Sequence, residues 1–388
     1  MYWGPFPSEN TGGHIVQEYL LNKMHEESPN HEFYAIPKNL ERLTPDKMPY
    51  IKFLIEGEDL DYIPRMMSKY HIPLLLPFHI SHEVEPVIDS VHNIGGKILM
   101  HQTVHFATDH LFRCHRLNDV DWISCPTKWG MKVLNMIGKV SMDKMSVIPH
   151  GVDTEKFCFR DTKMREHYRS KNKTVILFSG RLSIWKGVHQ IIPLFREFTE
   201  KKDCIFIIKA SPVNSEESLR LDAILKRISN QNEKVKYMPD WYPLNFVEGL
   251  FSSSDILISP TGSEGFNVPL IEAMACKMPV ITTSLPNHKE ILGEGTAMFV
   301  KPKIDAGMAD EQTILKVPSV DDLHDALLYL VENPEERQIM GETGRQRVLK
   351  YFDLNKVASQ WFELMNKLIP EDYSMEKEIM RRMESDNQ

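Results

Sequence analysis

Two basic residues, Arg181 and Lys186, stand five positions apart in "ILFSGRLSIWKG", directly after a run of apolar residues. Such a run is typical of a buried strand, and open α/β sheets bind their ligands at the carboxyl ends of their strands. Two cations at that edge suit a diphosphate, because guanidinium and ammonium groups donate charge-assisted hydrogen bonds to phosphate oxygens. The stretch is not a P-loop. The alternative interpretation is a loop with two solvated charges.

A second stretch, "SEGFNVPLIEA" at 263–273, carries Glu264 and Glu272. Eight residues of helix rise about 12 Å, whereas the carboxylates of a glycosidase pair lie roughly 5–9.5 Å apart. The proline suits a first helical turn, so Gly265, Phe266 and Asn267 lead into a helix N-terminus, whose amides attract anions. Carboxylates on both sides of that turn suit sugar hydroxyls at one end and ribose at the other. The alternative is a capped helix with solvated glutamates.

The first half of the chain offers weaker signals. Gly12 and Gly13 in "PSENTGGHIV" lie between a short apolar start and a helix-like segment. Glycine lets a backbone approach a phosphate closely, but the pattern is not G-x-G-x-x-G, and a plain turn is the alternative. His101 follows "KILM", which places it at the carboxyl edge of the first predicted sheet. A histidine without a functional role is the alternative there.

No metal site is predicted. The sixteen histidines concentrate in the first part of the chain, yet no spacing matches a known metal signature. The D-x-D patterns Asp59-Leu-Asp61 and Asp119-Val-Asp121 are short enough to arise by chance. Both are interpreted as surface.

Short apolar runs alternate with helix-like segments along the chain. Near-continuous apolar strands indicate parallel sheets covered on both faces, and the alternation indicates βαβ units. We therefore predict an α/β fold with two Rossmann-like doubly wound domains, at 1–160 and 161–352. The runs are 31–37, 50–57, 72–80, 97–104, 121–126 and 145–151 in the first half, and 173–180, 204–211, 234–240, 255–261 and 278–284 in the second.

Five local features refine this prediction. Only "MYW" precedes the first turn, so the opening strand is very short or truncated. Pro193 is expected to kink or delay a helix in "GVHQIIPLFREFTEKK", and Asn214 to cap the helix that follows it. The segment 334–369 is predicted to be helical, and the strongly charged tail, 370–388, to form a frayed, solvent-facing helix, separate from the domains as the stretch 371–388.

The composition excludes several classes of protein. The 388 residues are 42% hydrophobic and 26% charged, as in a soluble globular protein. A net charge of −8 provides no basic field for nucleic acid. The apolar run 72–78 is far shorter than a membrane span, and the N-terminus has no signal-peptide pattern. Five scattered cysteines without C-x-x-C indicate a reducing compartment, so we expect a cytoplasmic protein.

These motifs together resemble the retaining glycosyltransferases of family 4, which have the GT-B fold. The resemblance rests on "GRLSIWKG", "SEGFNVPLIEAMACKMPVI" and "VIPHGVDTEKF", and it covers roughly residues 4–365. It implies two Rossmann-like domains around a deep cleft, with a last helix at about 353–370 returning to the first domain. The sequence departs from the family at His150, where asparagine is more usual, and in its short opening strand.

The resemblance also implies roles for the residues of the second domain. Arg181 and Lys186 would neutralise the leaving diphosphate. Glu264 would contact the transferred sugar, and Glu272 would bind the ribose. Backbone amides near Phe266 and Asn267 would hold phosphate and sugar.

In the first domain, the resemblance implies that the amides of Gly12 and Gly13 close on the phosphates. His101 would lie near the reacting face of the sugar. The nucleobase would lie against the loop Tyr237–Asp240 through backbone contacts.

The predicted function is transfer of a sugar from a nucleotide-diphosphate sugar to an acceptor hydroxyl, with anomeric configuration retained. No cofactor and no metal are expected, since the two cations supply the positive charge. The alternatives are a nucleotide-sugar epimerase of the same architecture and a non-catalytic GT-B binding module. A pyridoxal-phosphate phosphorylase is disfavoured because no lysine context suggests a Schiff base. The acceptor is not indicated by any motif.

Overall fold

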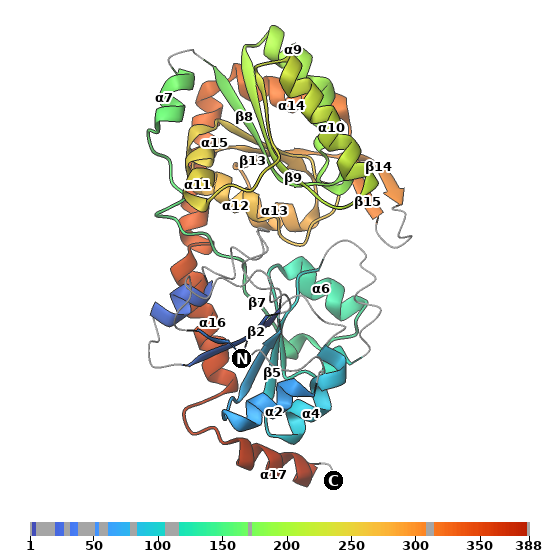
Figure 1. The fold of residues 1–388 in the computed structure, drawn as a ribbon, viewed down its shortest axis with the longest axis vertical. Coiled ribbons are helices and arrows are strands. Elements are labelled where there is room, and N and C mark those ends of the chain that lie inside the picture. The colour runs from blue at the N-terminus through green and yellow to red at the C-terminus, as the bar shows by residue number, and fades with distance from the viewer. Residues whose placement is uncertain are drawn as a thin grey trace. The chain divides into compact units, whose positions relative to one another are not determined.

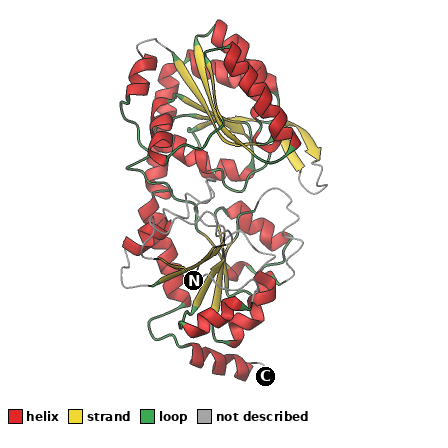
Figure 2. Cartoon of the chain, in the orientation of Figure 1, coloured by secondary structure: helices red, strands yellow, loops and turns green. Residues whose placement is uncertain are grey.

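Two parallel sheets form, one in each of the two units into which the chain divides. The first unit joins Met1–His150 to Leu354–Gln388, and the second is Gly151–Asp353. The computed structural model describes residues 2–4, 20–26, 32–37, 51–53, 61–77, 84–104, 116–169, 173–307 and 314–385. Helices flank both sheets (Figures 1 and 2). The α/β class predicted from the alternating runs is confirmed.

The first unit contains a seven-stranded sheet in the order β3-β2-β1-β4-β5-β6-β7, in which every neighbouring pair is parallel. Its opening strand is very short, as predicted, and yet it lies inside the sheet, between β2 and β4. The strands are β1 (Tyr2–Gly4), β2 (Phe33–Pro37), β3 (Ile51–Phe53), β4 (Leu74–Pro77), β5 (Lys97–His101), β6 (Trp122–Cys125) and β7 (Met145–Val147).

Helices of the first unit come from both ends of the chain. One buried cluster joins Leu76, Leu99 and Ile148, which belong to the sheet and the segment after β7, to Trp361 and Leu364 from the C-terminal part of the chain. The helices are residues 20–26, α2 (Tyr62–Lys69), α4 (Ile88–Asn93), α6 (Lys128–Met136), α16 (Leu354–Leu368) and α17 (Met375–Ser385).

The second unit repeats the pattern with a six-stranded parallel sheet in the order β10-β9-β8-β11-β12-β13. A separate antiparallel hairpin, β14–β15, stands apart from that sheet (Figure 2). The strands are β8 (Thr174–Leu182), β9 (Cys204–Pro212), β10 (Val235–Met238), β11 (Ile256–Ser259), β12 (Val280–Thr283), β13 (Ala297–Val300), β14 (Pro302–Gly307) and β15 (Ile314–Pro318).

Helices cover both faces of this second sheet, with α9 and α10 on one side and α11, α12 and α15 on the other (Figure 1). Among the described helices, none has the length and apolar composition that a membrane crossing requires. The helices are α7 (Lys163–Arg169), α8 (Val188–Ile191), α9 (Phe195–Glu200), α10 (Glu216–Gln231), α11 (Leu244–Ser253), α12 (Val268–Ala275), α13 (Pro286–Leu292), α14 (Val320–Glu332) and α15 (Pro334–Tyr351).

The strand order of the second unit fixes where a ligand can bind. From β8 the chain builds outward through β9 and β10, and it then returns to start β11 on the other side of β8. Connections to the two sides of this switch point leave a crevice at the carboxyl ends of β8 and β11. The loop carrying Arg181 and Lys186 follows β8, and the loop carrying Glu264 follows β11.

Several helix predictions need correction or detail. Pro193 lies in a single 3-10 turn, Ile192–Leu194, between α8 and α9, as its missing N–H and ring demand. The cap of α10 is Ser215, whose hydroxyl accepts from the Ser218 amide at 3.2 Å, and not Asn214. The helical segment 334–369 is two helices. Helix α15 ends at Tyr351 in the second unit, and α16 begins at Leu354, where the chain returns to the first unit. The predicted apolar runs did not include β13 or the β14–β15 hairpin.

The boundary between units lies at His150–Gly151, earlier than the predicted 160–161. The residues after it are bonded to the second unit. The Val152 amide donates to the Phe352 carbonyl at 2.8 Å, and the Arg160 amide donates to Ser252 Oγ at 2.9 Å. These bonds explain why the charged segment after Gly151 belongs to the second unit.

The charged tail forms a helix, as predicted, but the prediction that this helix faces the solvent is wrong. Helix α17 packs on the first unit through Glu378, which is 7% exposed and bonded to Lys97 at 3.4 Å. Arg382 of α17 donates to Asp121 Oδ1 at 3.0 Å. Asp121 is therefore not a free surface carboxylate either. The charged tail binds because its charges meet opposite charges at the edge of the sheet.

Candidate active site

The two cations after β8 have different surroundings. Arg181 is exposed, and its guanidinium makes no hydrogen bond or ion pair with any residue that the structure describes. Lys186 ends the short 3-10 helix η7 (Ile184–Lys186), and its methylene groups lie over Gly180, where a Cβ would be 3.7 Å from Lys186 Cδ. One cation is thus available to a ligand, and the other is held in place.

Gly187 determines the position of Lys186. Its φ is +76°, and a Cβ there would lie 2.2 Å from the Pro260 carbonyl oxygen. A left-handed backbone in close contact with another chain segment is a position that only glycine occupies without strain. This glycine lets the loop after β8 press against the end of β11.

Hydrogen bonds join the two loops of the switch point. The Trp185 carbonyl accepts from the Gly262 amide at 2.8 Å and from Thr261 Oγ1 at 2.9 Å. The Gly262 carbonyl in turn accepts from the Lys316 amide of β15 at 2.9 Å. The loop bearing Lys186 and the loop bearing Glu264 are therefore bonded to each other and to the β14–β15 hairpin.

Glu264 is the buried acid of these two bonded loops. It is 5% exposed, and its Oε1 forms an ion pair with Lys186 Nζ. Thr261 Oγ1 lies 3.2 Å from the same oxygen, and Asn287 Nδ2 donates to the Glu264 carbonyl at 2.6 Å. A buried carboxylate is stable only with such partners. Glu264 is consequently a fixed, charged hydrogen-bond acceptor at the carboxyl edge of the sheet.

Helix α12 begins beside Glu264, as predicted. Its N-cap Asn267 has φ +71°, and the Asn267 side chain donates to Ser259 Oγ at 3.0 Å instead of capping the helix. Within the described part of the chain, the amides of Gly265 and Asn267 have no hydrogen-bond acceptor. Phe266 is buried and packs edge-on against Phe352 with ring centroids 6.0 Å apart. The helix thus presents amide donors where an anion is stabilised.

A neutral histidine, His288, lies in the hydrogen-bond network at the ends of β11 and β12, next to the loop that carries Glu264. Thr282 Oγ1 donates to the Ser259 carbonyl at 2.8 Å, so it accepts from His288 Nδ1 at 3.0 Å. Burial lowers the pKa of His288 to about 4, which keeps the ring neutral. His288 therefore carries its proton on Nδ1 and fixes the end of β12 without adding a charge next to Glu264.

Glu272 lies on α12, second in the carboxylate pair. It is partly buried and makes no hydrogen bond or ion pair with the residues described. Burial raises its pKa to about 7, an effect that the Lys209 cation opposes and the Glu248 carboxylate adds to. An unpartnered, desolvated carboxylate is a candidate for ligand binding, because a hydroxyl donor would relieve its desolvation.

His101 ends β5 in the first unit and is almost fully buried. Its Nδ1 lies 2.8 Å from Ser124 Oγ of the neighbouring strand β6. The ring packs edge-on between His150, at 5.3 Å, and Trp361, at 5.2 Å. Burial lowers the pKa of His150 to about 4, so this neighbour is neutral. His101 is held at a single orientation at the predicted sheet edge. Gly12 and Gly13 lie outside the described residues.

Comparison with known proteins assigns the second unit. Residues 159–347 match the family described as glycosyl transferases group 1. These residues, which are similar to that family, are named the group 1 domain. Arg181, Lys186, the turn 264–267 and Glu272 all fall within this group 1 domain.

Curated relatives match over part of their length. A capsular polysaccharide biosynthesis glycosyltransferase, CapM of Staphylococcus aureus, is 27% identical over 220 residues, which is 55% of this chain and 51% of that protein. An MMP alpha-(1->4)-mannosyltransferase of Mycolicibacterium hassiacum is 25% identical over 234 residues, 59% of this chain and 50% of the relative. The chain therefore spans about half the length of these two relatives.

Solved structures match the fold over nearly the whole chain. A glycosyltransferase from Rickettsia africae has a TM-score of 0.76 at 16% identity and covers 96% of this chain and 99% of its own. Anabaena HepE in complex with UDP has a TM-score of 0.74 at 14% identity, covering 94% and 99%. The two Rossmann-like units are those of the GT-B fold, as the resemblance implied.

The group 1 domain also contains site residues that the sequence analysis did not single out. Asn287 anchors the Glu264 backbone, and Thr261 contacts its carboxylate. Lys209 acts on Glu272 from the end of β9. A signal existed for Asn287, since "LPNHKE" follows the predicted strand 278–284 at the carboxyl edge of the sheet. Lys209 gave no such signal, because it stands inside an apolar run.

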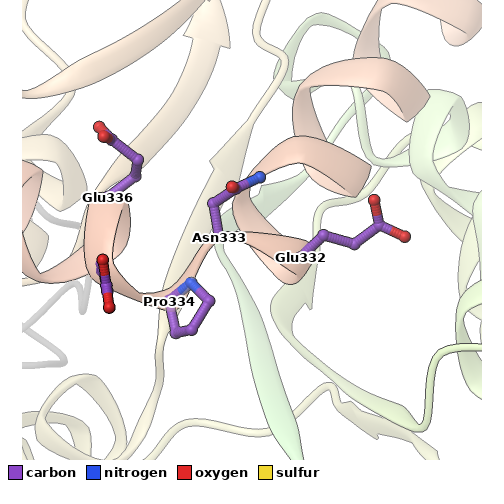
Figure 3. Close-up of a pocket in the computed structure, with 5 residues that line it drawn as sticks. Glu332, Asn333, Pro334 and Glu336 are labelled. Carbon is purple, nitrogen blue, oxygen red and sulfur yellow. The ribbon is translucent and has the colours of Figure 1, made fainter.

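A shallow pocket elsewhere in the group 1 domain does not fit the donor. It lies where α14 meets α15 and is lined by residues 332–336 (Figure 3). Three of these five residues are glutamates, and Glu332 pairs with Lys202 at 2.5 Å. An acidic lining repels a diphosphate, so the loops at the switch point are the better candidate.

We expect Gly187→Ala to weaken nucleotide binding and to lower the free energy of unfolding by about 1–3 kcal/mol, because the added Cβ meets the Pro260 carbonyl and the positive φ is strained. Gly249→Ala in α11 is the matched control, since its Cβ would meet nothing within 4 Å. Urea unfolding and nucleotide titration measure both effects. Equal behaviour of the two variants would contradict the role given to Gly187.

Proposed function

We propose that this protein is a glycosyltransferase that moves a sugar from a nucleotide-diphosphate sugar to an acceptor hydroxyl with retention of the anomeric configuration. The observation that carries the proposal is the Arg181 guanidinium, which has no partner among the described residues and lies at the same switch point as the Lys186–Glu264 pair. Two cations, a fixed carboxylate and helix amides at one sheet edge suit a diphosphate joined to a sugar.

The reaction breaks the bond between the anomeric carbon and the diphosphate oxygen, and both electrons leave on the diphosphate. The acceptor oxygen forms the new bond on the same face, and its proton leaves with the diphosphate. Arg181 and Lys186 stabilise the growing negative charge, together with the amides of Gly265, Phe266 and Asn267. Preorganised donors of this kind act more strongly on the transition state than on the substrate.

The carboxylates bind the two ends of the donor. Glu264, fixed by Lys186 and Asn287, accepts hydrogen bonds from hydroxyls of the transferred sugar. Glu272 accepts hydrogen bonds from the ribose. In the first unit, His101 is proposed to contact the sugar near its reacting face, with Ser124 holding the ring. Gly12 and Gly13 are proposed to close on the phosphates.

We further propose that the reaction needs no metal ion, since Arg181 and Lys186 supply two positive charges. The names of the relatives support transfer chemistry: they are a glycosyltransferase, a mannosyltransferase and a maltose-1-phosphate synthase. HepE, which has a similar fold, has been solved with UDP-glucose. The donor base, the sugar and the acceptor are left to experiment.

The test combines binding and stereochemistry, with water standing in for the unknown acceptor. Thermal unfolding in EDTA is followed with UDP-, GDP-, ADP- and dTDP-sugars, where a ligand at 100 times its Kd adds about 2.7 kcal/mol. Proton NMR then identifies the first anomer released from the stabilising donor. We expect one nucleotide family to stabilise the protein and the donor's own anomer to appear first. Inverted sugar, an epimerised donor, or no stabilisation by any sugar nucleotide would contradict the proposal.

A further inference from the structure

Lys209 is a buried-strand lysine at the carboxyl edge of the second sheet. It lies near the end of β9, paired with Ser179 of β8 on one side and with Met238 of β10 on the other. The next pair in the register joins Ala210 to Gly180, the residue under the Lys186 methylenes. Gly180 and Ala210 share the face on which the Lys186 methylenes lie, so the alternating side chain of Lys209 points to the opposite face of the sheet, the side that carries α12 and Glu272 (Figure 1).

Neither Lys209 nor Glu272 has a partner within the described residues. Lys209 is partly buried, and its ammonium makes no hydrogen bond or ion pair there; the same holds for the Glu272 carboxylate. Their charges nevertheless influence each other. Burial lowers the pKa of Lys209, and the nearby Glu272 carboxylate partly offsets that lowering. Burial raises the pKa of Glu272, and the Lys209 cation partly offsets that rise. The two charges therefore attract each other, although no direct hydrogen bond or ion pair joins them within the described residues.

Desolvated charges without partners are costly, so their presence calls for a ligand with matching groups. A carboxylate accepts two hydroxyl protons, and an ammonium group donates to an oxygen lone pair. A vicinal diol presents both: hydroxyl protons for the acid and oxygen lone pairs for the base. The ribose of the proposed donor is such a diol.

We propose that Lys209 and Glu272 bind the ribose of the donor nucleotide from two sides, and that Lys209 makes the site selective for ribonucleotides over 2′-deoxyribonucleotides. This inference rests on the proposed function for the binding of a nucleotide and assigns a role to a residue that no motif marks. Glu272 accepts from the hydroxyls while Lys209 donates to a ribose oxygen. A site built to bind a hydroxyl rejects the analogue that lacks it, because its own buried groups then lose a partner.

The charges around the pair determine its pH dependence. Glu248 of α11 faces Glu272 and raises the pKa of Glu272, while Lys156, Arg160 and Asp153 act on Glu248. Lys209 is the cation that lowers the pKa of Glu272. Nucleotide affinity should therefore rise with pH as Glu272 ionises near pH 7 and then level off. Without Lys209 this rise should move to higher pH.

The experiment measures the Kd of three pairs, UDP, ADP and GDP with their 2′-deoxy forms, by calorimetry between pH 6 and pH 9. The variants are Lys209→Met, Lys209→Arg and Glu272→Gln. Lys236→Met on the exposed surface of β10 is the matched control. We expect the wild type to prefer the ribonucleotide over the 2′-deoxyribonucleotide 10- to 100-fold, because the 2′-hydroxyl makes about two hydrogen bonds to charged groups at most. Lys209→Met should lose most of that preference and bind with a midpoint at higher pH.

Three outcomes separate the possibilities. If Lys209→Met weakens ribo and deoxy forms equally, Lys209 acts only on the fold or on the overall charge, and the inference is overturned. If preference and pH midpoint match those of the control, Lys209 does not reach the ribose. Should wild type bind none of the six nucleotides, the proposed function itself fails. Lys209→Arg, which keeps the charge, should retain part of the preference, and it replaces Lys209→Met in the test if that variant does not fold.

Discussion

Lys186→Met is expected to lower donor turnover by a factor of about 10²–10³ and to destabilise the protein. The catalytic loss follows from removing one preorganised cation from the leaving diphosphate. The loss of stability has a different cause. Without Lys186, the Glu264 carboxylate is buried, 5% exposed, with its cation gone. Breaking such a pair typically costs about 3–5 kcal/mol, and since Lys186 is 22% exposed we expect about 2–4.

A double variant separates these two effects. Lys186→Met combined with Glu264→Gln removes both charges, so most of the stability should return while turnover stays low. Lys202→Met provides the matched control, because the Lys202–Glu332 pair lies at the surface and should contribute less than about 1 kcal/mol. Urea unfolding and release of nucleoside diphosphate from the donor measure the two quantities. A double variant that is no more stable than Lys186→Met would show that the pair is not the cause.

Glu272→Gln is expected to strengthen the fold and to weaken the binding of nucleotide about 10- to 100-fold. Burial raises the pKa of Glu272 from an ordinary 4.5 to about 7. The folded protein therefore binds a proton more tightly than the unfolded chain does, and the free energy of unfolding falls as pH rises between these two values. Above about pH 7 the ionised Glu272 lowers the free energy of unfolding by its full amount. We place that amount at about 1–3 kcal/mol because the side chain is only partly buried.

The pH dependence provides the check. Unfolding of wild type and Glu272→Gln should differ little at pH 5, and the variant should be the more stable protein at pH 8. Glu233→Gln, at an exposed position after α10, should match wild type at both values. Titration with the stabilising nucleotide measures the accompanying loss of affinity. A Gln variant that is less stable at pH 8 would contradict the assignment of a desolvated carboxylate.

The two candidate loops of the second unit could be predicted because the residues of each loop lie close together in sequence. Arg181 and Lys186 share one loop, and Glu264 and the turn into α12 share another. Each loop follows an apolar strand, so the parallel sheet brings both to one edge. What the sequence did not reveal was that Lys186 and Glu264 pair directly. Their meeting depends on Gly187, whose positive φ brings the first loop against the Pro260 carbonyl.

The residues that were missed depend on long-range placement. Lys209 becomes a site residue only through the register of β9 with β8, which apolar periodicity does not determine. Asn287 reaches the Glu264 carbonyl from α13. The tail was misjudged for the same reason: Glu378 meets Lys97 across 281 positions, and composition alone indicated a solvated helix.

The discontinuity of the first unit has a consequence for how the chain is made. Its sheet is encoded before Gly151, but the helix that covers one face of that sheet, α16, is encoded after Asp353. During synthesis, Leu76, Leu99 and Ile148 leave the ribosome long before Trp361 and Leu364, which complete their cluster. Domains tend to fold as units as they emerge, and exposed apolar surface invites aggregation.

The order in which the two units begin to be synthesised therefore differs from the order in which they can complete their folding. The second unit is continuous and has all of its strands and helices once Asp353 has emerged. The first unit waits, with an apolar face uncovered, until the 15 residues of α16 have followed. The nascent chain is thus a natural client for chaperones during that interval, and a chain that has emerged only as far as the start of α16 holds a finished second unit and an unfinished first one.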